Sequence, residues 1–312
     1  MRFLVLGAGA VGGYFGGRMA ESGTDVTFLV RPARATAIHA GGLRIASTDG
    51  DAALQPHLLV AGESAPDPDG FDCVLLACKA YDLDAAIAAV APFAGARTSV
   101  LPLLNGLRHL ETLDDAFGTD RVLGGLCQIS ATLDPDGTIR HLGIPPRILF
   151  GERSGGTGPR MEALASAMQA ARFEAVASDD ILQDMWEKFT LLASLAAITC
   201  LMRAPVGTVV SQSGGAGFAR RMVDECIAVA SAAGHAPRPK FAERLVSLMT
   251  DARSALAASM LRDIERGGPT EGAHVLGDLA ARGAALGIAT PTLDLAALNL
   301  ASYEARRSAA DR

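Results

Sequence analysis

The glycines near the amino terminus have the spacing of a nucleotide-binding turn. Gly7, Gly9 and Gly12 follow the apolar run RFLVL and precede a segment with helical periodicity. In that order the first glycine permits a tight turn, the second lets the backbone approach a diphosphate, and the third allows close helix–strand packing. Backbone N–H groups and the positive end of the helix dipole favour an anion there. The pattern predicts that a dinucleotide is bound by Gly7, Ala8, Gly9, Ala10, Val11 and Gly12.

A basic residue stands at the position that discriminates between the two nicotinamide dinucleotides. The second β-rich run, DVTFLV, is followed directly by Arg31, with Arg34 nearby, and the next acidic residue is Asp49. An NAD site places an acid here for the ribose 2′-hydroxyl, whereas an arginine pairs with the 2′-phosphate of NADP. We therefore predict NADP(H) as the cofactor. The alternative is that Arg31 lies on a solvated loop.

Two more polar residues follow runs with the composition of buried strands. Lys79 comes after CVLLAC, and Asn105 comes after SVLPLL. Ligands of open parallel sheets bind at the carboxyl ends of the strands. Both side chains are therefore predicted to lie near the nicotinamide, and the alternatives are a surface lysine and a turn asparagine.

One lysine begins a long apolar segment. In residues 185–202 (MWEKFTLLASLAAITCLM) no charge follows Glu187 and Lys188, so a buried helix is predicted. Lys188 either extends its ammonium to solvent or points into a cleft, where the ammonium can act as an acid. A hydride-transferring site needs such a proton donor for the alkoxide that it creates.

A second polar cluster lies in ASMLRDIERGGPTEG. Ser259 and Asp263 are one helical turn apart, and Glu271 follows a Gly-Gly-Pro break. Thr270 or a nearby group is a candidate cap for the next helix. The cluster is either a solvated helix face or part of a site, because spacing alone does not bring Lys188 and Glu271 together.

The elements that must position these residues fall into two classes. From residue 2 to about 150, β-rich runs alternate with helical segments, which is typical of a parallel sheet wrapped by helices. Turn signals over residues 123–151 predict an antiparallel extension of that sheet. We predict an α/β Rossmann domain, with a mostly parallel sheet and helices on both faces, over residues 1–178. An all-α domain is predicted over residues 179–312.

Composition narrows the class of protein further. A chain of 312 residues that is 49% hydrophobic and 20% charged is not a disordered polymer. A net charge of -6 with scattered basic residues argues against nucleic-acid and membrane-surface partners. The glycine-rich start differs from a signal peptide, and the uncharged stretch 189–202 is shorter than the roughly 20 residues of a membrane helix. A cytoplasmic, soluble protein is expected, with reduced core cysteines and no metal site among its dispersed histidines.

Together, these motifs resemble the ketopantoate reductase (2-dehydropantoate 2-reductase) family over essentially the whole chain. The resemblance rests on GAGAVGG with Arg31, CKAYD, LLNG, RVLGG…DG…H…FGE, MWEKF and ASMLRDIERGGPTEG…GIATP. It implies an NADPH-dependent reduction of 2-dehydropantoate to pantoate in pantothenate biosynthesis. The β-hydroxyacid dehydrogenases, which also join a Rossmann domain to a helical one, fit the full-length pattern less well.

The resemblance also implies roles for single residues. Lys188 corresponds to the proton donor, and Glu271 to the acid that supports that lysine and the cofactor. Ser259 matches a substrate-binding serine, Asn105 the asparagine that contacts nicotinamide and substrate, and Lys79 a lysine near the cofactor. The partner is then a small keto acid, and both a monomer and a homodimer agree with the family.

Some positions depart from the family pattern. The family has asparagines four and eight residues after its lysine, where this chain has Leu192 and Ala196 on the helix face of Lys188. Their loss removes hydrogen bonds of about 0.5–3 kcal/mol each. Arg108, where a glycine is common, either contacts a carboxylate or faces solvent. Three hypotheses follow: a reductase of 2-dehydropantoate, a reductase of a more apolar 2-keto acid or carbonyl compound, and a non-catalytic NADPH sensor.

Overall fold

The computed structural model of the chain describes residues 1–62 and 70–310. The chain forms two compact units, one made of residues 1–104 and 109–182, the other of residues 105–108 and 183–312. The first unit carries all the strands of the described chain, and the second is helical. The predicted fold class is thereby confirmed, while the division of function at residue 178 stays a prediction.

A five-stranded parallel sheet forms the centre of the first unit. Its order is β5-β2-β1-β6-β7. The strands are β1 (Arg2–Leu6), β2 (Asp25–Val30), β5 (His57–Val60), β6 (Cys73–Leu76) and β7 (Ser99–Pro102). Leu6 pairs with Leu29 on one side and with Leu76 on the other, so the carboxyl ends of three strands share one edge. Fully buried side chains such as Phe3 and Phe28 stabilise this core, each by roughly 1.5–3 kcal/mol.

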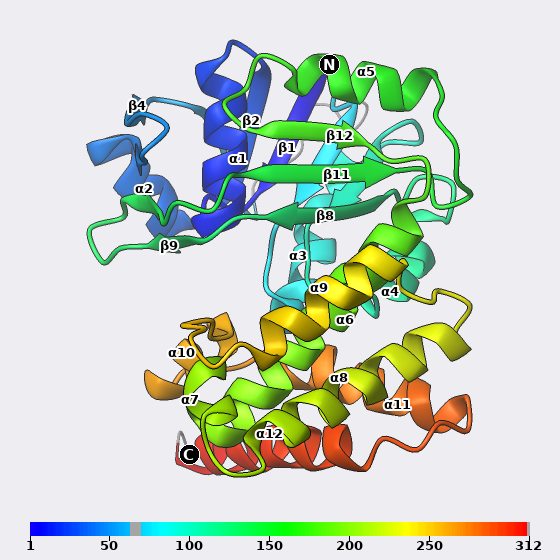
Figure 1. Cartoon of the computed structure of the whole chain (residues 1–312). Coiled ribbons are helices and arrows are strands. Elements are labelled where there is room, and N and C mark those ends of the chain that lie inside the picture. Colours follow the sequence, from blue (N-terminus) through cyan, green and yellow to red (C-terminus); the bar gives the residue numbers. More distant parts are fainter. Residues whose placement is uncertain (63–69, 311–312) are drawn as a thin grey trace. The chain divides into compact units, whose positions relative to one another are not determined.

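Helices and 3₁₀ turns follow the strands of this sheet. Between its strands lie α1 (Ala10–Glu21), α2 (Pro32–Gly41), η1 (Ala80–Asp82), α3 (Leu83–Val90) and η2 (Ala91–Phe93), and α4 (His109–Phe117) follows β7. Small residues let α1 approach strands on two sides. A Cβ atom at Gly16 would lie 2.8 Å from Cζ of Phe28 in β2, and one at Gly17 would lie 2.9 Å from Cδ1 of Ile45 in the second sheet. Helix α1 is therefore packed between two sheets (Figure 1).

Two smaller sheets complete the first unit, in the orders β4-β3-β10-β9 and β12-β11-β8. Their strands are β3 (Leu43–Ala46), β4 (Ala52–Leu54), β8 (Gly124–Gln128), β9 (Ala131–Leu133), β10 (Ile139–His141), β11 (Arg147–Gly151) and β12 (Glu174–Ala177). Helix α5 (Pro159–Met168) contacts β12 (Figure 1). The predicted antiparallel pairs are present as β9/β10 and β8/β11. The prediction that they extend the first sheet is wrong, because they belong to two separate sheets, in which β10 also pairs with β3, from much earlier in the sequence, and β11 with β12, the next strand after α5.

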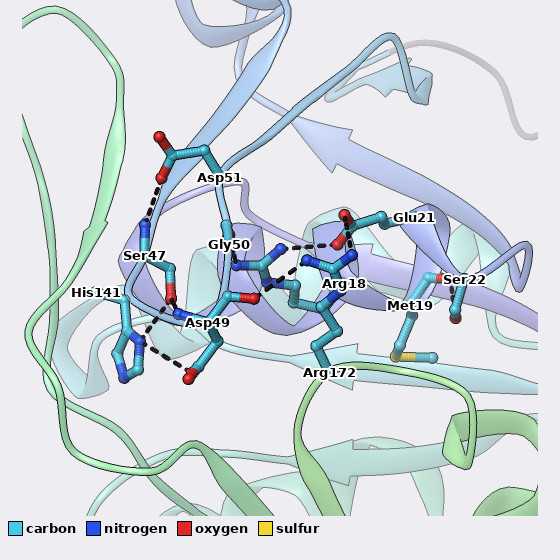
Figure 2. A network of polar contacts seen from close by, with 10 residues as sticks. All are labelled: Arg18, Met19, Glu21, Ser22, Ser47, Asp49, Gly50, Asp51, His141 and Arg172. Atoms are coloured by element: carbon cyan, nitrogen blue, oxygen red, sulfur yellow. Dashed lines mark hydrogen bonds and ion pairs between the residues drawn. The ribbon is translucent and has the colours of Figure 1, made fainter.

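A polar network ties α1 to the turn between β3 and β4 (Figure 2). Arg18 is fully buried, stacks on the ring of Tyr14 at 5.2 Å, and donates to Oε2 of Glu21 at 2.7 Å and to the carbonyl oxygen of Gly50 at 2.5 Å. In the same turn, Oγ of Ser47 lies 2.9 Å from Nδ1 of the buried His141. Its two terminal nitrogens are engaged, which offsets part of the cost of burying the charge, whereas Nε is buried without a hydrogen-bond partner.

The second unit contains α6 (Ile181–Met202) from residue 183 onward and the helices that follow it. These are α7 (Val206–Val210), α8 (Gly215–Ala232), α9 (Pro239–Thr250), α10 (Ser259–Glu265), the π-helical turn η3 (Ala273–Gly277), α11 (Asp278–Ala285) and α12 (Pro291–Ala310). Helix α6 is long and apolar enough to cross a membrane, with a mean hydropathy of 1.3 over its best window. However, 67% of that window is buried within the protein, as in a core helix.

Candidate functional site

The glycine-rich loop of the first unit has the geometry that its spacing predicts. Gly7 has φ +88° and its N–H donates to the carbonyl oxygen of Leu29 at 2.9 Å. A Cβ atom at Gly12 would collide with the carbonyl oxygen of Gly7 and approach Cβ of Ala77 to 3.2 Å. Gly9 precedes the first turn of α1, no side chain caps that turn, and no heavy atom lies within 4 Å of a Cβ built at Gly9. The first N–H groups of α1 therefore suit a diphosphate.

The remaining loop residues take different parts in this turn. Ala8 is buried, and its carbonyl oxygen accepts a hydrogen bond from Nε of Arg34 at 3.0 Å. Ala10 and Val11 form the beginning of α1 and are partly exposed. The same guanidinium of Arg34 donates to the carbonyl oxygen of Gly137 at 3.2 Å. Arg34 thus joins the glycine-rich loop to the turn before β10, and burial together with the nearby Arg44 lowers its pKa.

Arg31 directly follows β2 and has an exposed side chain. Its side chain is 75% exposed and forms an ion pair with Asp82 across 3.2 Å, and the Asp82 side chain is itself 37% exposed. Such exposed pairs contribute about 0–1 kcal/mol. A more highly charged anion can therefore displace Asp82 from Arg31 at little cost.

Lys79 lies at the carboxyl end of β6, as predicted. It is exposed and stands directly before η1, where its carbonyl oxygen accepts the N–H of Asp82 at 2.9 Å. Cys78 beside it is half-buried, whereas the other four cysteines are buried, and all five are reduced. Lys79 and Cys78, which follow β6, are thus both accessible to solvent.

Asn105 and Glu271 meet in the second unit. Nδ2 of Asn105 donates to Oε2 of Glu271 at 3.5 Å, although 166 positions separate the two residues in the chain. Glu271 is only 8% exposed. Gly106 follows Asn105 with φ +80°, a conformation that glycine adopts without strain. This pair is the part of the predicted site that the structure brings together.

Thr270, the residue before Glu271, is bonded to helix α12. The N–H and the hydroxyl of Thr270 both donate to Oε1 of Glu304 in α12, each at 2.7 Å, and the hydroxyl oxygen of Thr270 accepts the N–H of Gly272 at 3.3 Å. Thr270 thus bonds to the N–H of Gly272, the residue before η3, but no side chain caps η3 itself, so the capping role of Thr270 stays a prediction. Burial raises the pKa of Glu304, but the hydrogen bonds from Thr270 and the ion pair with Arg307 outweigh that effect and hold the pKa below its usual value.

Lys188 lies in the second turn of α6 within a buried helix. It is half-buried, and among the described residues no hydrogen bond or ion pair involves its side-chain ammonium. The adjacent Glu187 instead accepts from the backbone N–H and from Nε of Arg238, both at 2.8 Å. Leu192 and Ala196 follow one and two turns later; Leu192 is half-buried and Ala196 is 3% exposed. The face that begins at Lys188 is therefore apolar.

Ser259 is the first residue of α10 and is exposed. Asp263 follows one turn later and is half-buried. In the part of the chain that the structure describes, neither Ser259 nor Lys188 forms a hydrogen bond or ion pair with Asn105 or Glu271. Their roles therefore stay predictions.

Two residues next to this pair were missed by sequence reasoning. His274 lies beside Gly106. Glu304 accepts hydrogen bonds from Thr270 and belongs to α12, which starts at Pro291. His274 follows Glu271 by three positions, a helical spacing that indicates a shared face. No local signal marks Glu304, because its partner comes from another helix.

The family models and the relatives that match this chain point to one family. Residues 3–155 match the family model "Ketopantoate reductase PanE/ApbA", and residues 180–304 match "Ketopantoate reductase PanE/ApbA C terminal". The chain is 40% identical over 307 residues to "Uncharacterized oxidoreductase YkpB" of Bacillus subtilis (strain 168), covering 98% of this chain and 100% of that protein. It is 31% identical over 315 residues to the 2-dehydropantoate 2-reductase of Mesorhizobium japonicum, covering 94% and 95% of the two chains.

Solved structures show the same fold. The 2-dehydropantoate 2-reductase of Geobacter metallireducens GS-15 superposes with a TM-score of 0.85 at 30% identity, covering 97% of this chain and 99% of that one. A D-mandelate dehydrogenase with NADH and anilino(oxo)acetate gives a TM-score of 0.85 at 21% identity, covering 99% and 100%. The latter similarity concerns the fold alone.

Proposed function

The chain belongs to the ketopantoate reductase family of oxidoreductases, and from that premise we propose that it reduces a 2-keto acid to the 2-hydroxy acid with NADPH. The favoured substrate is 2-dehydropantoate, which would yield pantoate for pantothenate biosynthesis. The observation that carries the proposal is the contact between Asn105 and the buried carboxylate of Glu271, in the unit that also contains Lys188.

The first unit has residues that fit a dinucleotide with a 2′-phosphate. The uncapped first turn of α1 and the open space at Gly9 suit the diphosphate. Arg31 follows β2 where an NAD site has an acid, and its exposed guanidinium suits the 2′-phosphate. Lys79, at the end of β6, is the proposed second cation near the cofactor. When bound, NADPH supplies a hydride for the carbonyl carbon of the substrate.

Residues of the second unit would supply the proton for the carbonyl oxygen and orient the substrate. We assign to Lys188 the transfer of a proton to the carbonyl oxygen, because an ammonium also stabilises the negative charge that develops there. The carboxylate of Glu271 would keep that lysine in its charged form. Asn105, which already donates to Glu271, has an amide oxygen left to accept a hydrogen bond from a ligand.

Substrate selection is assigned to Ser259 and to the face of α6. The exposed hydroxyl of Ser259 at the start of α10 would bind a carboxylate or hydroxyl group of the substrate. Leu192 and Ala196 present apolar groups on the helix face of Lys188. That observation favours a second candidate function, the reduction of a more apolar 2-keto acid or related carbonyl compound by the same chemistry.

The proposed context is that of a small-molecule enzyme. The net charge of -6 supports a protein that acts on a soluble keto acid in the cytoplasm and has no nucleic-acid or membrane partner. A monomer and a homodimer both agree with this function.

The test follows NADPH oxidation by the purified protein with 2-dehydropantoate and a series of apolar 2-keto acids, with NADH as the control cofactor. Turnover of 2-dehydropantoate with NADPH supports the favoured substrate. Turnover of the apolar acids alone supports the second candidate. Tight NADPH binding without any turnover would overturn both and favour a non-catalytic sensor.

A further inference from the structure

One turn of chain contacts the Asn105–Gly106 turn at two points. Glu271 accepts a hydrogen bond from the Asn105 side chain. His274, three residues later, packs against the backbone of the next residue: a Cβ atom at Gly106 would lie 3.1 Å from Cδ2 of the imidazole and 3.1 Å from the carbonyl oxygen of His274. The side chain of Asn105 and the backbone of Gly106 are thus both contacted by the same helical turn.

The local backbone explains how Glu271 and His274 both reach the Asn105–Gly106 turn. The carbonyl oxygen of Glu271 accepts from the N–H of His274 at 3.1 Å and from that of Val275 at 2.9 Å, where the π-helical turn η3 begins. These two bonds span three and four residues, the spacing that places Glu271 and His274 on one helix face. The π-helical turn follows directly, and such turns, although uncommon, occur often at functional sites.

The imidazole also bonds to the segment that it covers. A ring N–H of His274 donates to the backbone carbonyl oxygen of Asn105. Burial lowers the pKa of His274, the carboxylates of Glu271 and Asp278 oppose this change, and Arg108 adds to it. The lowered pKa favours the neutral form of the ring.

We propose that His274 is a positioning residue of the reductase, which fixes the Asn105–Gly106 turn so that the Asn105 amide stays directed at Glu271. The inference rests on the proposed function of Asn105 and Glu271. With the amide nitrogen engaged by the carboxylate, the amide oxygen keeps one orientation toward a ligand. Loss of the imidazole N–H frees the turn, and Asn105 then samples orientations that do not support catalysis.

The experiment compares His274→Phe, which keeps a ring without an N–H, with His274→Asn and His274→Gln, which place an amide N–H near either ring-nitrogen position. We expect His274→Phe to lower kcat about tenfold, as a misplaced positioning group does, while the Kd of NADPH changes less than about twofold. One of the two amide variants should recover most of kcat. His39→Phe, on the exposed side of α2, is the matched control and should leave kcat unchanged.

A second measurement does not depend on turnover. Amide hydrogen exchange of a peptide spanning residues 103–108 should be faster in His274→Phe than in the wild type, and the amide variant that recovers kcat should slow it again. Wild-type kcat in His274→Phe, or equal loss in all three variants, would overturn the inference. If the wild type reduces no 2-keto acid, the proposed function fails, and the exchange rates alone decide whether His274 holds the turn.

Discussion

The side-chain amide of Asn105 lies 3.5 Å from the carboxylate of Glu271, and the two residues come from opposite halves of the chain. Asn105 follows the last strand of the parallel sheet by three residues, yet it packs with the helical unit. An asparagine that follows a strand is therefore attached to the glutamate that is proposed to support the proton donor.

Replacement of Lys188 by alanine should abolish reduction but not cofactor binding. Removal of a general acid lowers kcat by about 10²–10⁴-fold. We expect the Kd of NADPH, measured by its fluorescence, to stay within about twofold, because the nucleotide site belongs to other residues. Lys240→Ala is the matched control, since Lys240 is exposed on α9. Unchanged turnover in Lys188→Ala would remove this residue from the mechanism.

Cofactor preference should depend on Arg31 and, in the opposite sense, on Asp82. Arg31→Ala is expected to raise the KM of NADPH by about 10- to 100-fold through loss of charged hydrogen bonds to the 2′-phosphate. Asp82→Asn should lower that KM by about threefold, because it removes a weak competing ion pair. The KM of NADH is the control for both variants. Equal changes for the two cofactors would show that Arg31 does not contact the 2′-phosphate.

Amides introduced on the α6 face should shift selectivity toward polar substrates. In Leu192→Asn with Ala196→Asn, we expect kcat/KM for 2-dehydropantoate to rise about tenfold relative to a 2-keto acid that lacks the hydroxyl group. Leu192→Ala serves as the control for lost volume. Because Ala196 is 3% exposed, thermal unfolding must first show that the double variant folds. An unchanged selectivity ratio in the folded variant would mean that this face does not contact the substrate.

The buried Arg18 should matter for stability. Its removal leaves the carbonyl oxygen of Gly50 without this donor and Glu21 with only the longer ion pair to Arg172 at 3.8 Å, and Arg18→Ala is expected to cost about 3 kcal/mol. The free energy of unfolding in urea measures the effect. Arg44→Ala, which breaks the exposed ion pair with Asp136, is the matched control and should cost at most about 1 kcal/mol. Similar losses in both variants would contradict a special role of the network.

Acid should weaken the attachment of Thr270 to α12. The pKa of Glu304 lies below its ordinary value of 4.5, so its ionised form stabilises the folded state. That contribution is complete above about pH 4.5 and is lost as the pH falls through the folded-state pKa. Glu304→Gln should therefore cost about 1–2 kcal/mol at pH 7 and progressively less below pH 4.5. A difference from the wild type that is independent of pH would contradict this assignment.

The order of strands and helices could be predicted because it depends on local patterns. The apolar run before Gly7, the glycine spacing and the uncharged stretch after Lys188 each specify their own element, and the structure has them in those places. The partners of the strands over residues 123–151 could not be predicted. Turn signals indicate antiparallel pairs of neighbouring strands, whereas β10 also pairs in parallel with β3, from much earlier in the sequence, and β11 in parallel with β12, across helix α5.

The sequence by itself determined which residue types are available: a glycine-rich turn, an arginine after the second strand, one lysine in an apolar helix, and an asparagine and a glutamate far apart. Only the tertiary structure decided that Asn105 meets Glu271 and that His274 packs against the Asn105–Gly106 turn. It likewise decided that Arg31 forms an ion pair with Asp82. The physical reason is that periodicity and capping act within a few residues. Contacts across the chain depend on how whole helices and strands pack.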